Sequence, residues 1–436
     1  MEKERILEVL NDWNFWSKEQ PIGIEREEYL NVLFNILNTT DTILAIVGVR
    51  RAGKSFLLRQ LAKKLMNKGV GKDSILIVNF EDERFGERNL QLLRDIYETY
   101  MEEFKSPKNR FIFLDEIQTV REWEKFARGI HERREAKLII SGSSAKMLSE
   151  ELATLLTGRS LNFFIYPLDF REFLQFKKIE VKNKLELVEK RFVIKKYMKE
   201  YLEFGGFPEV VLSNEKLRIL LSYFDTVVLK DVVDRFRIRE REKIRVLAKY
   251  YLSNVSSPVT FRRISEFLKI PLKTTERFSN YLEIANLIFF IKRFSFSLKE
   301  QEKSPRKVYA IDTGLSNAIG FRFSENIGRI IENAVALELR RRQSFIPTLE
   351  VYYWKGNGGK EVDFVVKNRG KLQLIQACRS VEKAEVKKRE IQALLKASNE
   401  LKCNNLVVVT EDYEGSERVK KKEVKFIPLW RWLLSE

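Results

Sequence analysis

The stretch GVRRAGKSF, Gly48 to Phe56, decides the fold of the N-terminal part of this chain. Its letters match G-x-x-x-x-G-K-S, the phosphate-binding P-loop signature, in which glycines let the backbone wrap around an anion. The apolar run DTILAIVGV (41–49) precedes the loop and predicts a buried strand. The run SFLLRQLAKKLMNKG (55–69) follows it with apolar residues at helical spacing. Strand, glycine loop and helix form the context that the motif requires.

The P-loop motif assigns a chemical role to each of its parts. Backbone N–H groups of the loop and of the helix N-terminus bind phosphates. We expect Lys54 to reach the β- and γ-phosphate oxygens and Ser55 to hold Mg²⁺. The cofactors predicted are therefore ATP or ADP with Mg²⁺. The loop residues expected to contact the nucleotide are Gly48, Val49, Arg50, Arg51, Ala52, Gly53, Lys54, Ser55 and Phe56.

A P-loop needs a second strand that ends in an acidic residue, and RFIFLDEIQTV (110–120) supplies one. We expect Asp115 to contact Mg²⁺ and Glu116 to polarise the attacking water. The strand in KLIISGSSAKM (137–147) ends in hydroxyl residues, so either Ser143 or Ser144 senses the γ-phosphate or both lie in a plain turn. With the apolar run at 75–85, these segments predict at least four parallel strands with helices between them.

The segment before the P-loop allows two interpretations. Trp13 and Trp16 lie one helical turn apart, and Arg26 precedes a predicted helix. Either this lead-in covers the adenine, with Arg26 near the base, or the two tryptophans simply pack in the core.

The composition is strongly basic. Among 436 residues, 80 Lys and Arg face 62 Asp and Glu, a formal net charge of +18. This excess points to an acidic partner such as nucleic acid, although a charged, ion-paired surface is also typical of thermophile proteins. The charged N-terminus and the short apolar runs predict neither a signal peptide nor a membrane span. Two cysteines and one histidine predict no zinc site and a cytoplasmic protein.

A winged helix-turn-helix is predicted in 241–312, where three helical patterns precede two alternating strands. Its third helix (272–287) is polar and basic at its start, as a helix entering the major groove would be. Winged helices also bind proteins, so that alternative stays open. The residues expected to contact DNA are Lys273, Thr274 and Arg277 on the third helix and Arg262, Arg263, Lys292 and Arg293 at phosphates.

The last part of the chain predicts the order α-β-β-β-α-β. Glu332 lies in the first helix, Asp363 on the second strand and Gln376 on the third. A restriction-endonuclease-like site has acids at these places and a lysine two residues after the last one. Here that position is Cys378, so we expect a vestigial site with weak or no nuclease activity, unless Lys360 or Lys371 supplies the charge.

Together these patterns predict an α/β protein in five parts. They are a lead-in, an AAA+-like P-loop domain with a parallel sheet, a helical lid, the winged helix-turn-helix and a restriction-endonuclease-like α/β domain. The expected boundaries are 1–40, 41–165, 166–240, 241–312 and 313–436.

The chain resembles an archaeal and bacterial ATPase family of the AAA+/STAND group. Its members join a P-loop ATPase to a winged helix and to a C-terminal domain of the PD-(D/E)XK nuclease superfamily. The resemblance rests on the motifs GVRRAGKS, FIFLDEI, TGRSLNFFIYPLDFREFL, FGGFPEVV, DVVDRF, RKVYAIDTGL, ENAVALEL and EVDFVV. It implies that Arg159 contacts nucleotide in its own chain or the γ-phosphate of a neighbour; a plain surface turn is the alternative.

Three functions follow as expectations. The first is a DNA-associated ATPase, whose partner is duplex or branched DNA and which forms a homo-oligomer. The second is a STAND-like switch that holds a nucleotide and binds protein partners. The third is a working nuclease, which depends on the C-terminal domain alone.

Overall fold

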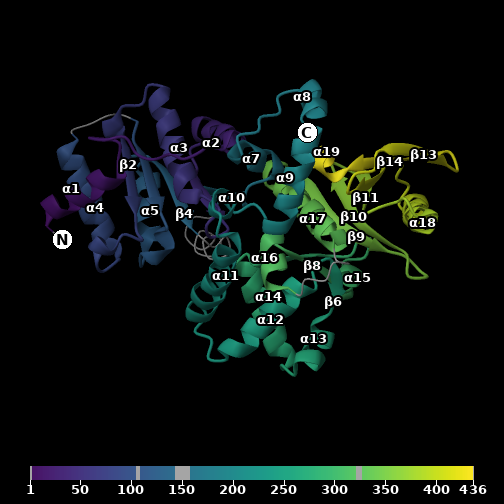
Figure 1. The fold of residues 1–436 in the computed structure, drawn as a ribbon. Helices are drawn as coiled ribbons and strands as arrows, with labels where there is room; N and C mark the ends of the chain where they lie inside the picture. The colour runs from purple at the N-terminus through teal and green to yellow at the C-terminus, as the bar shows by residue number, and fades with distance from the viewer. Residues whose placement is uncertain (1, 105–108, 143–157, 321–326, 436) are drawn as a thin grey trace. The chain divides into compact units, whose positions relative to one another are not determined.

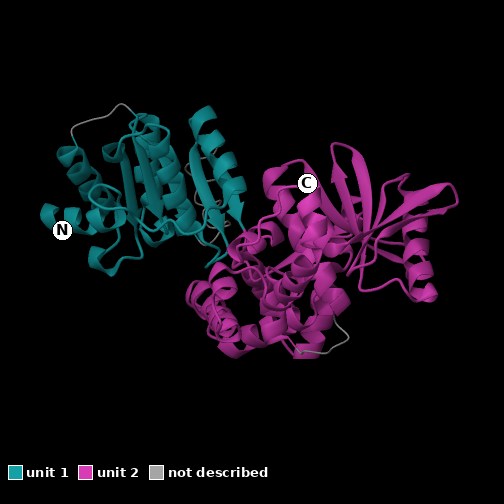
Figure 2. Cartoon of the chain, turned by 45° about the horizontal axis from the view of Figure 1, so that its top comes forward, with its two compact units in different colours: residues 1–165 teal, residues 166–436 magenta. Residues whose placement is uncertain are grey.

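The computed structural model describes residues 2–104, 109–142, 158–320 and 327–435. The chain forms two compact units, residues 1–165 and 166–436 (Figure 2). Both units combine helices with a sheet, as the sequence predicts (Figure 1). The finer division of the second unit into lid, winged helix and C-terminal domain stays a prediction.

The first unit is built on a five-stranded parallel sheet. Its strands stand in the order β2-β3-β4-β1-β5, so a fifth strand, β5, joins the four that the sequence predicts. Nearly every side chain of the central strands is buried, because helices cover both faces. The strands are β1 (Ile43–Gly48), β2 (Ile75–Asn79), β3 (Phe111–Asp115), β4 (Lys137–Gly142) and β5 (Ser160–Ile165).

The helices of the first unit divide between the two faces of this sheet. One continuous core joins α1, α4 and α5 to alternate residues of the strands, among them Ala45, Val78 and Leu114. Helices α2 and α3 pack against each other, and α3 contacts β1 and β3. These helices are α1 (Lys3–Trp13), α2 (Glu27–Thr39), α3 (Lys54–Asn67), α4 (Leu90–Glu103) and α5 (Trp123–Glu132).

The second unit begins with helices that converge on a glycine pair. The backbone N–H of Gly206 donates to the carboxylate of Asp312 at 2.7 Å. The carbonyl oxygen of Gly206 accepts a hydrogen bond from the backbone N–H of Leu168. A Cβ at Gly206 would lie 2.2 Å from the Leu168 carbonyl oxygen, so only glycine fits this close approach. The helices are α7 (Phe170–Phe176), α8 (Lys184–Glu189), α9 (Arg191–Phe204), α10 (Pro208–Leu212) and α11 (Lys216–Thr226), which continues as a π-helix, η4 (Val227–Asp234).

Five helices and a small antiparallel sheet follow. The sheet has the order β6-β8-β7, with β8 in the centre. A short helix, α15, occupies the segment between the two predicted strands. These elements are α12 (Arg241–Ser253), β6 (Ser257–Val259), α13 (Phe261–Leu268), α14 (Leu272–Ile284), β7 (Ile288–Ile291), α15 (Leu298–Lys303), β8 (Arg306–Ala310) and α16 (Thr313–Ile319).

A six-stranded mixed sheet closes the second unit. Its order is β13-β14-β12-β11-β10-β9, with parallel pairing of β11, β12 and β14. The predicted α-β-β-β-α-β order is present. The hairpin of β13 and β14 and the helix α19, which follow it, were not predicted. The elements are α17 (Ile327–Phe345), β9 (Leu349–Lys355), β10 (Glu361–Asn368), β11 (Lys371–Cys378), α18 (Ala384–Glu400), β12 (Leu406–Thr410), β13 (Gly415–Val419), β14 (Lys422–Pro428) and α19 (Leu429–Leu434).

The two sheets of the second unit are joined by backbone hydrogen bonds. Tyr353 of β9 donates its N–H to Lys292 and accepts one from Phe294, just after β7. In the ranges that the structure covers, no helix has the length and apolar character needed to cross a membrane.

Candidate functional site

The P-loop lies at the carboxyl end of β1 and turns directly into α3. Gly53 ends the loop in the left-handed region, with φ of 91°, and Arg51 also has a positive φ of 67°. Gly48 packs on β5, where an added Cβ would lie 2.2 Å from the Ile165 carbonyl oxygen. The glycines of the motif are therefore needed for conformation and for close packing. The first N–H groups of α3 have no partners within the helix, as at any helix N-terminus, and so can bind phosphate.

The ammonium group of Lys54 is buried within this loop. Its side chain is 4% exposed, and Nζ donates to the carbonyl oxygens of Gly48 at 3.3 Å and Val49 at 3.2 Å. The carboxylate of Glu116 lies 3.8 Å from the same nitrogen. The structure thus brings the loop lysine and the acidic strand end together, as the sequence predicts.

Asp115 is buried at the end of β3 and is held by two serines. Ser141 of β4 donates a hydrogen bond to its Oδ1, and Ser55 at the start of α3 also hydrogen-bonds it. Burial raises the pKa of the Asp115 carboxyl above its ordinary value, although both serine hydrogen bonds lower it. Ser141 was not among the predicted site residues. It lies near the end of the predicted strand, two residues before Ser143, and this position could have indicated it.

Glu116 is fixed next to this aspartate in a left-handed conformation, with φ of 53°. Its backbone N–H donates to Ser141 Oγ at 3.2 Å. Its Oε2 accepts a hydrogen bond from Gln118 at 2.5 Å. The strand therefore ends in two carboxylates with separate partners, so that the two side chains can take different roles.

These residues fit a magnesium nucleotide. A buried carboxylate with a raised pKa lacks sufficient positive charge nearby, and a divalent cation supplies such charge. Ser55 and Asp115 are in contact and offer the oxygen atoms that Mg²⁺ prefers. Lys54 and the start of α3 offer the charge and the N–H donors that phosphates need.

The lead-in segment packs around the loop. The indole N–H of Trp13 donates to Asp82 and that of Trp16 to the Ile75 carbonyl, so both tryptophans take part in core packing. The guanidinium of Arg26 donates to the carbonyl oxygen of Ala52 at 2.9 Å and thereby braces the P-loop. That Arg26 lies beside the base stays a prediction.

The contacts of the remaining predicted residues with nucleotide stay predictions. Phe56 is 43% exposed, beneath the guanidinium of Arg59, and Arg50 pairs with Glu81 at 3.4 Å. Ser143 lies outside the described residues, so its predicted role stays a prediction.

The structure corrects the interpretation of Arg159. Its backbone carbonyl accepts a hydrogen bond from Ile43, the first residue of β1, whereas the P-loop follows Gly48, the last residue of β1. These two ends of the strand are about 16 Å apart at the usual rise per residue. Arg159 therefore does not contact a nucleotide held by its own P-loop. Its side chain is 43% exposed and pairs with Glu132 at 2.7 Å; the contact with a neighbour's γ-phosphate stays a prediction.

A second cluster of charged groups lies in the second unit, around Lys307 of β8. Its ammonium group is buried and contacts three carboxylates, those of Glu332 at 2.9 Å, Glu361 at 2.8 Å and Asp363 at 2.8 Å. Burial lowers the pKa of Lys307, but the carboxylates of Asp363 and Glu332 outweigh burial and hold its pKa well above the ordinary value. Lys307 is therefore a permanent cation in this cluster.

Hydrogen bonds place each member of this cluster. Tyr309 donates its hydroxyl to Glu332 at 2.8 Å. The side-chain amide of Asn333, the next residue of α17, makes two hydrogen bonds to the backbone of Ala310 and so holds β8 against that helix. Asp363 also accepts from the N–H of Ala377 at 2.9 Å.

Gln376, predicted at the third position of the vestigial site, lies next to Asp363. Gln376 Oε1 accepts from the backbone N–H of Asp363 at 3.3 Å, so its neutral amide lies beside the aspartate. Burial raises the pKa of the Cys378 thiol to about 12, which keeps this side chain neutral. The lysine that reaches the acids is Lys307, not Lys360 or Lys371, because Lys360 donates to Gln392 instead and the side chain of Lys371 is exposed at the start of β11.

The predicted DNA contacts are also placed by the structure. Arg262 and Arg263 are exposed on α13, while Lys273 and Arg277 are exposed on α14 and Thr274 is half-buried there. Lys292 pairs with Glu302. The guanidinium of Arg293 donates to the carbonyl oxygen of Lys355 at 2.5 Å and is partly buried at the junction of the two sheets. Its contact with phosphate stays a prediction.

Comparison with known proteins agrees with this geometry. Residues 40–174 match a family model described as an AAA domain, and 195–326 and 327–432 match two domains of unknown function, DUF8612 and DUF4143. An uncharacterized protein of Methanocaldococcus jannaschii, MJ1544, is 37% identical over 409 residues, which is 91% of this chain and 89% of that protein. The chain belongs to this family of AAA-domain P-loop proteins.

Two further similarities extend the comparison. An uncharacterized protein of Haemophilus influenzae is 33% identical over 362 residues, which is 81% of this chain and 86% of that protein. Among solved structures, the Walker-type ATPase PABY2304 of Pyrococcus abyssi is 16% identical. That match covers 68% of this chain and 96% of the other, with a TM-score of 0.45.

Proposed function

We propose that this AAA-family protein is a Mg²⁺-dependent ATPase that binds DNA through its second unit. The observation that carries the proposal is the convergence of Lys54, Ser55 and the Asp115–Glu116 pair at one edge of the sheet. Phosphoryl transfer uses a lysine that binds the phosphates, an aspartate that holds Mg²⁺ and a glutamate that orients the water. All three lie together here at the N-terminus of α3.

The residues would divide the work of hydrolysis. Lys54 and the N–H groups at the start of α3 hold the phosphates, and Ser55 with Asp115 holds Mg²⁺, which neutralises charge that develops on the phosphate oxygens. Glu116 orients the attacking water and accepts its proton, because its carboxylate is less buried than Asp115 and is anchored by Gln118. Ser141 holds both acidic residues in register.

The DNA-binding part of the proposal rests on the elements around α14. Their order, α12-β6-α13-α14-β7-β8, with β8 in the centre of the small sheet, supports the proposal that they form a winged helix. Four basic side chains are exposed on its two central helices, namely Arg262, Arg263, Lys273 and Arg277. A net charge of +18 favours a polyanionic partner for such a face.

A protein partner is the second candidate, and one observation favours it. Phe267 of α13 is 71% exposed, and Phe296 in the segment after β7 is 86% exposed. Large exposed aromatic side chains are typical of protein interfaces. A nucleotide-controlled switch that binds protein would use this apolar surface rather than the basic one.

We further propose that the C-terminal domain does not cut DNA. Its α-β-β-β-α-β order and its acids at Glu332 and Asp363 support a relation to PD-(D/E)XK nucleases. Lys307, however, places an ammonium group within 2.9 Å of both acids, where a nuclease would hold its metal ion. One cation excludes the other, because both need the same carboxylate oxygens.

Nucleotide turnover tests the proposed ATPase. Glu116→Gln should bind ATP but hydrolyse it at least about a hundredfold more slowly, because only activation of the water is lost. Lys54→Ala should lose nucleotide binding, because the buried charge that faces the phosphates is removed. Phosphate release and binding of a fluorescent ATP analogue measure the two effects. Glu98→Gln and Lys68→Ala, at exposed positions of the same unit, are matched controls; turnover by Glu116→Gln at the wild-type rate would refute the assigned role.

DNA affinity tests the basic face. Charge reversal of Arg262, Arg263 and Arg277 to Glu should weaken duplex binding and lower the slope of log K against log salt by about 0.9 per lost phosphate contact. Titration of the full-length protein with a labelled duplex at several salt concentrations measures both quantities. Reversal of three other exposed arginines, Arg191, Arg218 and Arg369, controls for net charge. An unchanged slope in the first variant would instead support a protein partner.

Cleavage assays test the inert nuclease domain. The wild-type protein should leave supercoiled, branched and single-stranded DNA intact with Mg²⁺ or Mn²⁺, because Lys307 occupies the metal position. An Asp363→Ala variant assayed beside it identifies contaminating nuclease, which would persist in both. Cleavage that disappears in the variant would show a working nuclease and contradict this part of the proposal.

A further inference from the structure

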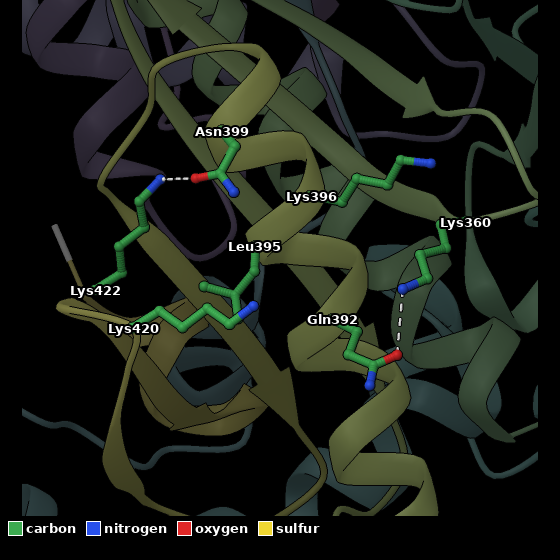
Figure 3. Close-up of a pocket in the computed structure, with 7 residues that line it drawn as sticks. All are labelled: Lys360, Gln392, Leu395, Lys396, Asn399, Lys420 and Lys422. Atoms are coloured by element: carbon green, nitrogen blue, oxygen red, sulfur yellow. Dashed lines mark hydrogen bonds between the residues drawn. The ribbon is translucent and has the colours of Figure 1, made fainter.

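A lysine-lined pocket lies on the C-terminal domain, away from the Lys307 cluster. It has a volume of about 410 Å³ and is bounded by α18, by the residue before β10 and by the β13–β14 hairpin. Four lysines from these three segments line it (Figure 3). They are Lys360, Lys396, Lys420 and Lys422.

The charges of these lysines are not neutralised by acids. Lys360 donates to the amide oxygen of Gln392 at 3.2 Å, and Lys422 donates to Asn399 at 2.8 Å. Lys396 donates to the backbone carbonyl of Asn357. Within the described ranges, none of the four forms an ion pair with a carboxylate, whereas Lys387 on the same helix pairs with Glu417 at 2.6 Å. The pocket therefore carries about four uncompensated positive charges.

The helix dipole of α18 explains only part of this charge. Lys396 lies four residues before the last residue of α18, outside its last turn, and the dipole at that end is equivalent to only about half of one negative charge. Lys360 and Lys420 come from other segments and gain nothing from that helix end. Four like charges around one cavity repel one another, so an anion bound there would relieve an unfavourable arrangement.

The remaining lining residues indicate which anion fits. Apart from the lysines, the wall consists of Gln392, Asn399 and the aliphatic Leu395, with no aromatic ring among the lining residues. A nucleotide base or another flat ring is commonly held by stacking on an aromatic side chain, and this wall offers none. Lysines act as point charges on phosphate, and their spread over three segments suits several phosphate groups along one chain.

We propose that this pocket binds the phosphodiester backbone of nucleic acid, as a contact surface separate from α13 and α14. The inference rests on the proposed DNA binding and adds a second site to it. Because the contacts would be to the backbone, the pocket would add affinity and salt dependence without sequence preference.

Four lysine-to-glutamine substitutions test the proposal in the full-length protein. Replacement of all four, Lys360, Lys396, Lys420 and Lys422→Gln, should lower the affinity for a labelled duplex at least about a hundredfold at low salt. They should also reduce the slope of log K against log salt by about 2 to 3. The matched control removes four other exposed lysines that lack ion pairs, Lys178, Lys184, Lys196 and Lys199→Gln, and should change the slope by less than about one unit. A single Lys420→Glu variant at an exposed position repeats the test with minimal risk to folding.

The outcomes separate this inference from the proposed function. Equal losses in the pocket variant and in its control would show a general charge effect and overturn the inference. An unchanged slope in the pocket variant would also overturn the inference. If reversal of Arg262, Arg263 and Arg277 weakens binding in the same assay, the proposed function survives. No binding of duplex by the wild-type protein at low salt would overturn both. Competition by inorganic phosphate that saturates only in proteins with the pocket intact would show a small-anion site instead, and would also overturn it.

Discussion

The carboxylate of Asp115, buried at the end of β3, is the constraint on which the first unit depends. A buried carboxylate is costly unless hydrogen bonds or a cation compensate it. Its partners come from two other elements, Ser141 on β4 and Ser55 at the start of α3. The order β3-β4-β1 is what makes this possible, because it places the serine strand between the acidic strand and the P-loop strand. Fold and site are therefore consequences of the same arrangement.

A second buried charge organises the second unit in a comparable way. Lys307 comes from the small sheet, and its three acidic partners come from α17 and β10. Removal of either side would leave an uncompensated buried charge, which typically costs about 3–5 kcal/mol. The ammonium group thus ties the two parts of this unit together. The same ammonium group contacts Glu332 and Asp363, and the proposal that this domain does not cut DNA rests on that contact.

The sequence predicted the first unit well because its signals are local. The P-loop, the strand before it and the Asp115–Glu116 pair each lie within about ten residues, and their periodicity and glycines have direct physical meaning. Ser141 escaped notice because its role depends on which strands are neighbours, and strand order is not encoded locally. The distance of Arg159 from its own P-loop escaped prediction for the same reason, since only the register shows that it lies at the far end of β1.

In the second unit, local patterns predict the order of the elements but not all of the contacts between them. The order of its elements and the positions of Glu332, Asp363 and Gln376 were predictable from patterns along the chain. Lys307 was not, because it is far from all three in sequence and looks like an ordinary strand residue. Arg293 looked like an exposed basic residue, yet the junction between two sheets partly buries it. In both cases, contacts between elements decide the chemistry of a side chain.

Calorimetric titration of ATP, with and without Mg²⁺, tests the central claim most directly. If Ser55 and Asp115 form the metal site, Mg²⁺ should tighten ATP binding to the wild-type protein by at least about tenfold, or about 1.4 kcal/mol. Asp115→Asn keeps the size of the side chain but removes its charge, and should lose this dependence while still binding metal-free ATP through Lys54. An Asp115→Asn protein with the same response to Mg²⁺ as the wild type would contradict the account.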